Sequence, residues 1–400
     1  MLFRDSNFRR LWIGQTISEI GSRISREGLP LTAVIVLGGA ASDMGLLQAA
    51  AGFAALLTAP MAGWMADRFH RRPVMIAADI GRAALLGLIP LAAVQGWLSL
   101  PLLYFVAASA GMLTVCFDVA YQTIVPALVS RGHLLEANSK LALTASAAEM
   151  VGPAITGFLV QALTAPRAIL IDSLSFLASA FFLSRLRVEE AAAPPSDEHP
   201  VREALDGVRY VINHSLLRPL LLRDAMASFF FGFFSTLYVL FAVKELGIGP
   251  ALLGVIIAVG GASNFLGAIL AEQAGRRFPV GRILITASAA SGAVMLLIPL
   301  AYGPVWGAAV LAAAQLLGDI SYPIYSIHEL TFRQQVAPPD RLGRVNAAMQ
   351  MAFKGIWPLG ALVGGYLATA FGIRPTLVLA GLGVLFSTLV LVLSPIRDSR

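Results

Sequence analysis

Gly63-Trp-Met-Ala-Asp67-Arg68-Phe-His-Arg71-Arg72-Pro73 is the stretch that decides how the rest of this 400-residue sequence is interpreted. An apolar segment ends in an acid, and a basic cluster then fills a tight loop before the next apolar segment begins. Gly63 would let two helices approach closely, and Asp67 would lie against helix N-termini and the basic cluster. The stretch therefore predicts two membrane helices joined by a short, positively charged loop.

The composition is that of an integral membrane protein. Hydrophobic residues make up 57% of the chain and charged residues 13%, and the mean hydropathy is +0.76. A soluble domain carries about 25% charged residues. Apolar runs near 20 residues recur, and each is long enough to cross a hydrocarbon core of about 30 Å. The single cysteine, Cys116, excludes an internal disulfide bond.

Turn residues divide the chain into twelve predicted spans. The spans cover roughly residues 9–37, 45–66, 74–96, 100–125, 140–163, 167–187, 217–243, 250–273, 281–301, 304–329, 344–370 and 373–394. Lysine and arginine concentrate in alternate loops, so the positive-inside rule predicts that both termini are cytosolic. The net charge of +6 is therefore a topology signal, and we expect the lipid bilayer rather than nucleic acid as the partner.

The chain also repeats itself. A shift of 209 residues aligns Phe8-Arg9-Arg10-Leu11 with Leu217-Arg218-Pro219-Leu220, and a shift of 208 aligns Gly152 with Gly360. The repeat predicts two six-helix halves, residues 1–187 and 216–400, joined by a cytosolic linker at 188–215 that contains a short surface helix. In the second half Glu272 and Arg276 stand where the first half has Gly63 and Asp67, so only the first loop keeps the motif.

Three motifs carry a family resemblance. The first loop resembles motif A of the major facilitator superfamily, and Gly152-Pro153-Ala-Ile-Thr156-Gly157 is similar to the G-P-x-x-G-G signature of its antiporters, with Thr156 replacing one glycine. Ala204-Leu-Asp-Gly207-Val-Arg-Tyr210, Leu342-Gly343-Arg344-Val345-Asn346 and Pro358-Leu359-Gly360 are similar to segments of the enterobactin-exporter-like, multidrug-efflux branch. The resemblance implies an all-α fold of twelve transmembrane helices in two pseudo-symmetric bundles that works by alternating access. It also implies a gating role for a set of charged and small residues: Gly63, Asp67, Arg68, Arg71, Arg72, Arg82 and Asp118.

Charged residues inside the predicted spans are candidates for substrate binding and proton coupling. A charge at mid-bilayer costs roughly 2.5–3.5 kcal/mol, so such residues face cavities or partners. The first span carries a stripe of four, and other spans contribute three at comparable depth: Glu19, Arg23, Arg26 and Glu27, then Glu149, Asp319 and Lys354. Because burial disfavours a charged carboxylate, we expect the acids at positions 19, 149 and 319 to couple transport to protons. The alternative is a set of structural ion pairs, such as an internal Glu19–Arg23 pair.

Aromatic residues complete the predicted cavity. The family resemblance places the seventh and tenth helices along the cavity, and rings there and on the eleventh helix would form its apolar wall: Phe230, Phe234, Tyr238, Tyr322, Tyr325 and Trp357. The alternative is ordinary packing against lipid and neighbouring helices. Arg23 and Arg26 favour solutes with anionic or carboxylate groups. For the adjacent pair Arg223-Asp224 we expect side chains on different helix faces and assign no role.

The sequence contains no phosphate-binding loop and no nucleophile elbow, so it predicts neither an ATP-driven pump nor an enzyme. The resemblance predicts a monomeric secondary transporter of the bacterial cytoplasmic membrane. It would export a small amphipathic solute, drug-like or siderophore-like, in exchange for protons, without cofactor or metal. Two alternatives stay open: an uptake carrier or lysophospholipid flippase of the same fold, and a membrane sensor or scaffold that does not transport.

Overall fold

The computed structural model describes residues 5–187, 200–338 and 341–399, apart from the side chains at positions 63, 64, 66, 67, 131 and 200–205. The described residues form thirteen α-helices and no β-strand. The chain divides into two compact units. The first comprises Met1–Gly38 and Ala50–Asp197, and the second comprises Gly39–Ala49 and Glu198–Arg400.

The helices of the first half follow the predicted spans closely. They are α1 (Ser6–Leu31), extended by a π-helical turn (Thr32–Val36), α2 (Ala41–Arg68), α3 (Arg71–Gln95), α4 (Leu100–Leu128), α5 (Leu134–Leu163) and α6 (Ala165–Ser184). A 3-10 turn (Arg131–His133) leads into α5.

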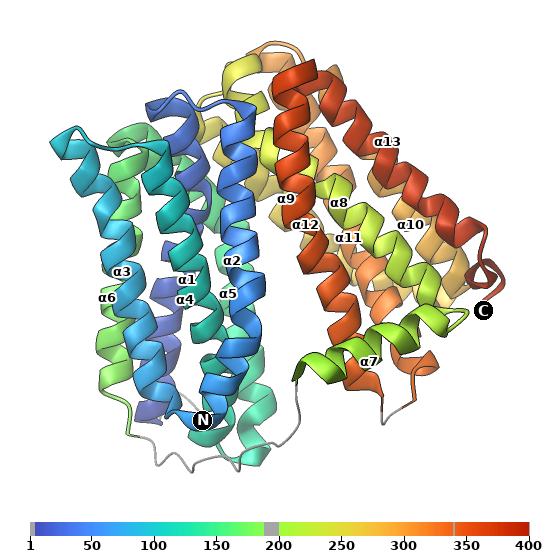
Figure 1. Cartoon of the computed structure of the whole chain (residues 1–400), viewed down its shortest axis with the longest axis horizontal. Coiled ribbons are helices and arrows are strands. Elements are labelled where there is room, and N and C mark those ends of the chain that lie inside the picture. Colours follow the sequence, from blue (N-terminus) through green and yellow to red (C-terminus); the bar gives the residue numbers. More distant parts are fainter. Residues whose placement is uncertain (1–4, 188–199, 339–340, 400) are drawn as a thin grey trace. The chain divides into compact units, whose positions relative to one another are not determined.

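The second half begins with a helix that does not span. The helices are α7 (Pro200–Asn213), α8 (Leu217–Leu240), extended by a π-helical turn (Phe241–Glu245), α9 (Pro250–Arg277), α10 (Val280–Met295), α11 (Pro304–Val336), α12 (Leu342–Phe371) and α13 (Ile373–Val392). Short 3-10 turns follow α10 (Ile298–Leu300) and α13 (Pro395–Asp398). Helix α7 is the surface helix expected in the linker, and it runs across the ends of α8 and α12 (Figure 1).

Among the described residues, ten helical segments are long and apolar enough to cross a membrane. They account for every long helix except α1 and α12. Helix α1 carries the charged stripe from Glu19 to Glu27, and the middle of α12 combines Lys354 with several glycines. Both features lower the mean hydropathy of a helix, which is why α1 and α12 are not among these ten segments.

The internal repeat is visible in backbone details. The two π-helical turns begin at Thr32 and Phe241, 209 residues apart, and each is followed by a glycine with positive φ, Gly38 and Gly247. Thr164 is the only described non-glycine residue with positive φ (83°), and its counterpart 208 residues later is Gly372 (95°). The two halves therefore share a backbone plan down to single turns.

Helix neighbours repeat in the same way within each unit. In the first, α6 packs against α1 and α3, α5 packs against α1, and α4 packs against α3. In the second, α13 packs against α8 and α10, α12 packs against α8, and α11 packs against α10. The aligned residues Phe8 and Leu11 in the first half and Leu217 and Leu220 in the second are all fully buried. Equivalent apolar positions thus form the core of each unit.

Candidate functional site

The charged stripe of α1 meets α5 through an ion pair. Arg23 Nη1 lies 3.3 Å from Glu149 Oε1, and the exposed fractions of the two side chains are 16% and 56%. A charged pair on spanning helices is costly against lipid, so the exposed carboxylate is expected to face water. The structure therefore joins two of the sequence-predicted residues in one pair, and it links Arg23 to another helix rather than only to its own.

Gly152 explains how α1 and α5 come close enough for this pair. A methyl group at position 152 would lie 2.6 Å from Arg23 Cγ and 2.7 Å from Arg23 Cβ, distances that real side chains do not tolerate. One turn further along α5, the hydroxyl of Thr156 donates to the Gly152 carbonyl at 2.9 Å. Pro153 and Gly157 are buried in the same segment. The antiporter-like motif of α5 thus forms the surface on which Arg23 rests.

The remaining predicted charges occupy separate places. Glu19 and Glu27 on α1 are half-buried, and Arg26 is exposed. In the second unit, Asp319 of α11 packs so closely on Gly260 of α9 that a larger residue there would collide with its carboxylate. Lys354 is exposed on α12.

Three of the predicted aromatic residues lie on α8 and α12, which pack against each other. The rings of Phe234 and Tyr238 lie 5.1 Å apart, and Trp357 Nε1 donates to Ser235 Oγ, next to Phe234 in the chain, at 3.1 Å. Phe230 instead packs its ring on Gly383 of α13.

Tyr325 belongs to a buried polar network in the second unit. Its hydroxyl donates to Asp224 Oδ1 at 2.8 Å, and the Arg223 guanidinium lies 3.7 Å from the centre of its ring. Arg223 also donates to Asp224 Oδ1 at 3.0 Å and to Ser288 Oγ at 2.9 Å. The expectation that Arg223 and Asp224 point to different faces is wrong, because the long arginine side chain bends back to its neighbour. Tyr322, by contrast, is 52% exposed.

A second buried ion pair extends this network along α11. Arg333 Nε lies 3.6 Å from Glu329 Oε1, and both side chains are about nine-tenths buried. Sequence reasoning gave Glu329 no role in coupling and did not single out Arg333. The spacing of Tyr325, Glu329 and Arg333 in steps of four would have placed them on one face of a helix.

In the motif A loop, Arg72 anchors the start of α3 to the end of α6. Its Nε donates to the Leu183 carbonyl at 3.0 Å, and its Nη2 donates to the Ser184 carbonyl. A cation at the last carbonyls of a helix is favoured by the helix dipole. Arg68 is exposed and Arg71 is half-buried. The predicted roles of the Gly63 and Asp67 side chains fall outside the described residues.

Arg82 is buried between aromatic rings rather than at the loop. It donates to Asp79 one turn before it on α3. Its guanidinium carbon lies 4.4 Å from the ring centre of Phe117 and 4.1 Å from that of Phe176. This arrangement satisfies the charge inside the contact of α3, α4 and α6. Asp118, predicted to join the same network, is exposed on α4.

Comparison with known proteins identifies relatives across the whole chain. A family model described as Major Facilitator Superfamily matches residues 11–360. The uncharacterised MFS-type transporter YfiS of Bacillus subtilis (strain 168) is 25% identical, and the alignment covers 100% of this chain and 96% of YfiS. The multidrug efflux pump Tap of Mycolicibacterium fortuitum is 27% identical over 89% of this chain and 88% of Tap.

Solved structures share the fold at low sequence identity. The nucleoside transporter NupG superposes with a TM-score of 0.77 at 12% identity, covering 96% of this chain and 98% of NupG. A bacterial homologue of the iron transporter ferroportin, in an inward-facing state, gives a TM-score of 0.77 at 17% identity and covers 98% of each chain. At these identities the likeness concerns the fold alone.

Proposed function

The chain belongs to the major facilitator superfamily, and on that premise we propose that it exports small amphipathic solutes in exchange for protons. It is a multi-pass membrane transporter and not an enzyme. Export is supported by the Tap relatives, which are multidrug efflux pumps, and by the antiporter-like motif of α5. We place the protein in the bacterial cytoplasmic membrane as a monomer, with both termini in the cytosol.

The Arg23–Glu149 pair is the observation that carries the proposal. Exchange requires that proton and solute compete for one group, and the exposed carboxylate of Glu149 can bind either a proton or a cationic group of the solute. Protonation removes the negative charge and with it the attraction for Arg23 and for a cation. Glu149 can therefore alternate between binding the solute and binding a proton, and this exchange requires no cofactor.

The sign of the solute charge separates exchange from its main alternative. A cationic solute displaces the proton from Glu149, which gives antiport. An anionic solute would instead pair with Arg23 and leave Glu149 to take up a proton, which gives transport of both in the same direction. The pair therefore favours cationic amphipathic solutes for export, in place of the anionic solutes that Arg23 and Arg26 suggested in the sequence. Proton-coupled uptake of a carboxylate is the second candidate.

Other predicted residues keep their proposed roles. Glu19, which is half-buried on the same helix as Arg23, and Asp319 in the second unit are further candidates for proton coupling. Phe234, Tyr238 and Trp357 are the candidate contacts for the apolar part of the solute.

The test is a fluorescent pH-gradient assay in everted membrane vesicles, with amphipathic cations, zwitterions and carboxylates added one at a time. We expect cations to collapse the gradient in wild-type vesicles and to have little effect with Glu149→Gln. Glu136→Gln is the matched control, because Glu136 lies in the first turn of the same helix and pairs with Lys140 at 3.6 Å.

Equal collapse in Glu149→Gln and wild-type vesicles would reject Glu149 as the coupling residue. A response only to carboxylates, with uptake of protons and solute together, would replace export by the uptake alternative. Absence of any response, in vesicles shown to contain folded protein, would reject proton coupling.

A further inference from the structure

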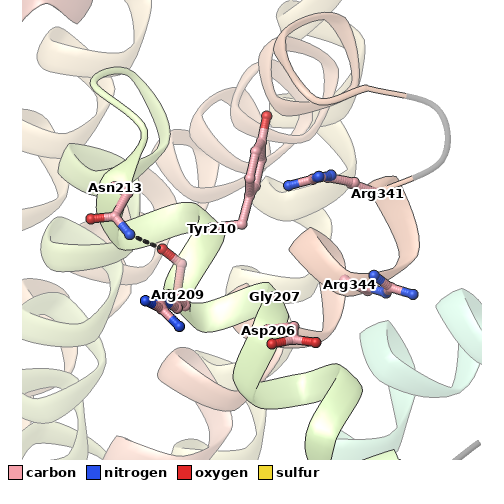
Figure 2. A pocket seen from close by; sticks show the side chains of 7 residues that line it. All are labelled: Asp206, Gly207, Arg209, Tyr210, Asn213, Arg341 and Arg344. Atoms are coloured by element: carbon pink, nitrogen blue, oxygen red, sulfur yellow. Dashed lines mark hydrogen bonds between the residues drawn. The ribbon is translucent and has the colours of Figure 1, made fainter.

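Helix α7 and the start of α12 line an open cavity of about 380 Å³ that shares no residue with the transport proposal. Seven residues line it: Asp206, Gly207, Arg209, Tyr210, Asn213, Arg341 and Arg344 (Figure 2). Five of the seven fall in two of the segments that resemble the efflux branch, residues 204–210 and 342–346, which the transport proposal does not use. The structure thus gathers two sequence motifs into one site.

The cavity exists because α7 is docked firmly on the second unit. Val211 is fully buried in the core of that unit, and Val208 and Tyr210 pack against the same core. A side chain at position 207 would collide with the backbone carbonyl of Arg344, so glycine is required where α7 crosses the start of α12. Packing therefore contributes to the relative position of α7 and α12.

The lining is strongly basic. Arg209, Arg341 and Arg344 are exposed, and Asp206 is the single acid among the seven lining residues. Figure 2 shows Arg341 beside the ring of Tyr210, with 5.0 Å between its guanidinium carbon and the ring centre. Arg341 and Arg344 also stand at the N-terminus of a 30-residue helix with no acid in its first turn, where the dipole disfavours cations. A bound anion would offset the mutual repulsion of the three arginines and the unfavourable interaction of Arg341 and Arg344 with the helix dipole.

The position of the cavity indicates which anion reaches it. Helix α7 leads through a short turn into the span that begins at Leu217, and α12 begins at Leu342, so the cavity lies where spanning helices end. Guanidinium groups match phosphate geometry, and basic pockets beside membrane helices bind anionic headgroups. Ile212, which precedes the lining residue Asn213 in the chain, is 46% exposed on the same helix, and we expect an acyl chain, unlike a free phosphate ion, to gain from such an apolar side chain.

We propose that this cavity binds the phosphate of an anionic phospholipid headgroup at the membrane surface. The lipid would hold the linker helix α7 and the first turn of α12 together through one phosphate. The proposal does not depend on the direction of transport or on proton coupling.

Native mass spectrometry of the purified full-length chain tests the proposal. Phosphatidylglycerol and phosphatidylcholine with matched acyl chains are titrated against wild type, Arg341→Gln/Arg344→Gln and the control Arg276→Gln/Arg277→Gln. The control removes two exposed arginines from the last turn of α9. We expect wild type and control to prefer phosphatidylglycerol, and the first variant to bind it about tenfold more weakly or worse.

The double lysine variant, Arg341→Lys/Arg344→Lys, controls for misfolding of the glutamine variant. It keeps the charge but loses the planar geometry, so its affinity should fall between those of the other two proteins. Equal affinity for phosphatidylglycerol and phosphatidylcholine in wild type, or equal affinity of wild type and both variants for phosphatidylglycerol, would overturn the proposal. Displacement of the lipid by equimolar inorganic phosphate would show that the site binds free anions, and it would overturn the proposal that the ligand is a phospholipid.

Discussion

Gly152→Ala tests the contact that positions Arg23. The added methyl group would lie 2.6 Å from Arg23 Cγ and 2.7 Å from Arg23 Cβ, whereas contacts shorter than 3.0 Å are essentially never seen. Because Arg23 Cβ is fixed to the backbone of α1, the clash cannot be relieved by the end of a flexible side chain. Either α1 and α5 separate or α5 bends.

The expected cost follows from three effects. Overpacking a tight contact costs about 1–3 kcal/mol, whereas alanine gains about 1 kcal/mol over glycine in helix propensity. Loss of the Arg23–Glu149 pair adds at most about 1 kcal/mol, because the Glu149 side chain is 56% exposed. Gly318→Ala serves as the control, since its nearest contact would be an ordinary 3.4 Å to Val294. The propensity gain is common to both variants, so the difference between them should be about 1–4 kcal/mol in favour of Gly318→Ala.

Thermal unfolding in detergent, followed by far-ultraviolet circular dichroism, provides the measurement. The loss of helix reports unfolding of both units, so Gly152 in the first unit and Gly318 in the second can be compared. We expect Gly152→Ala to melt several degrees below Gly318→Ala. Melting of Gly152→Ala at or above the control would refute the close contact between α1 and α5.

Two further substitutions use the same melting assay. Tyr325→Phe leaves the Asp224 carboxylate without its 2.8 Å donor and should destabilise by about 1–3 kcal/mol, whereas Tyr366→Phe, at an exposed position, should not. Equal melting of the two would contradict the network. Arg72→Gln removes the donors to the last carbonyls of α6 and should cost about 1 kcal/mol relative to Arg277→Gln at an exposed position. A melting temperature for Arg72→Gln equal to that of its control would show that the bond to α6 is not stabilising.

The helical plan was predictable because each element has a local cause. Apolar length sets the spans, glycines mark the turns, and the repeat offset of about 209 residues carries one half onto the other. The π-helical turns at Thr32 and Phe241 obey the same offset, although no sequence signal predicted their hydrogen-bond pattern.

The partners of the charged residues were not predictable in the same way. The stripe on α1 suggested an internal pair between Glu19 and Arg23, yet Arg23 pairs with Glu149 because Gly152 admits its side chain. The angle between adjacent helical residues predicted that Arg223 and Asp224 lie on different faces of the helix. The long Arg223 side chain nevertheless bends back to Asp224. Contacts between helices, such as Arg23–Glu149, depend on how the two helices are placed against each other. The periodicity of a single helix carries no information about that placement.

The docking of α7 shows the same limit. The linker sequence predicted a surface helix, and the structure has one. The clash that forbids a side chain at Gly207 involves the carbonyl of Arg344, far along the chain. Only the packed structure brings those two residues into one site.

The central claim, that a proton and a solute exchange at Glu149, is tested most directly in proteoliposomes containing the purified protein. Two quantities are measured for each variant: solute accumulation driven by an imposed pH gradient, and solute exchange without a gradient. We predict that wild type and Glu136→Gln show both, whereas Glu149→Gln loses gradient-driven accumulation and exchanges the solute more weakly, because a neutral amide attracts a cation no better than the protonated acid does. Gradient-driven accumulation by Glu149→Gln at the wild-type rate would contradict the account.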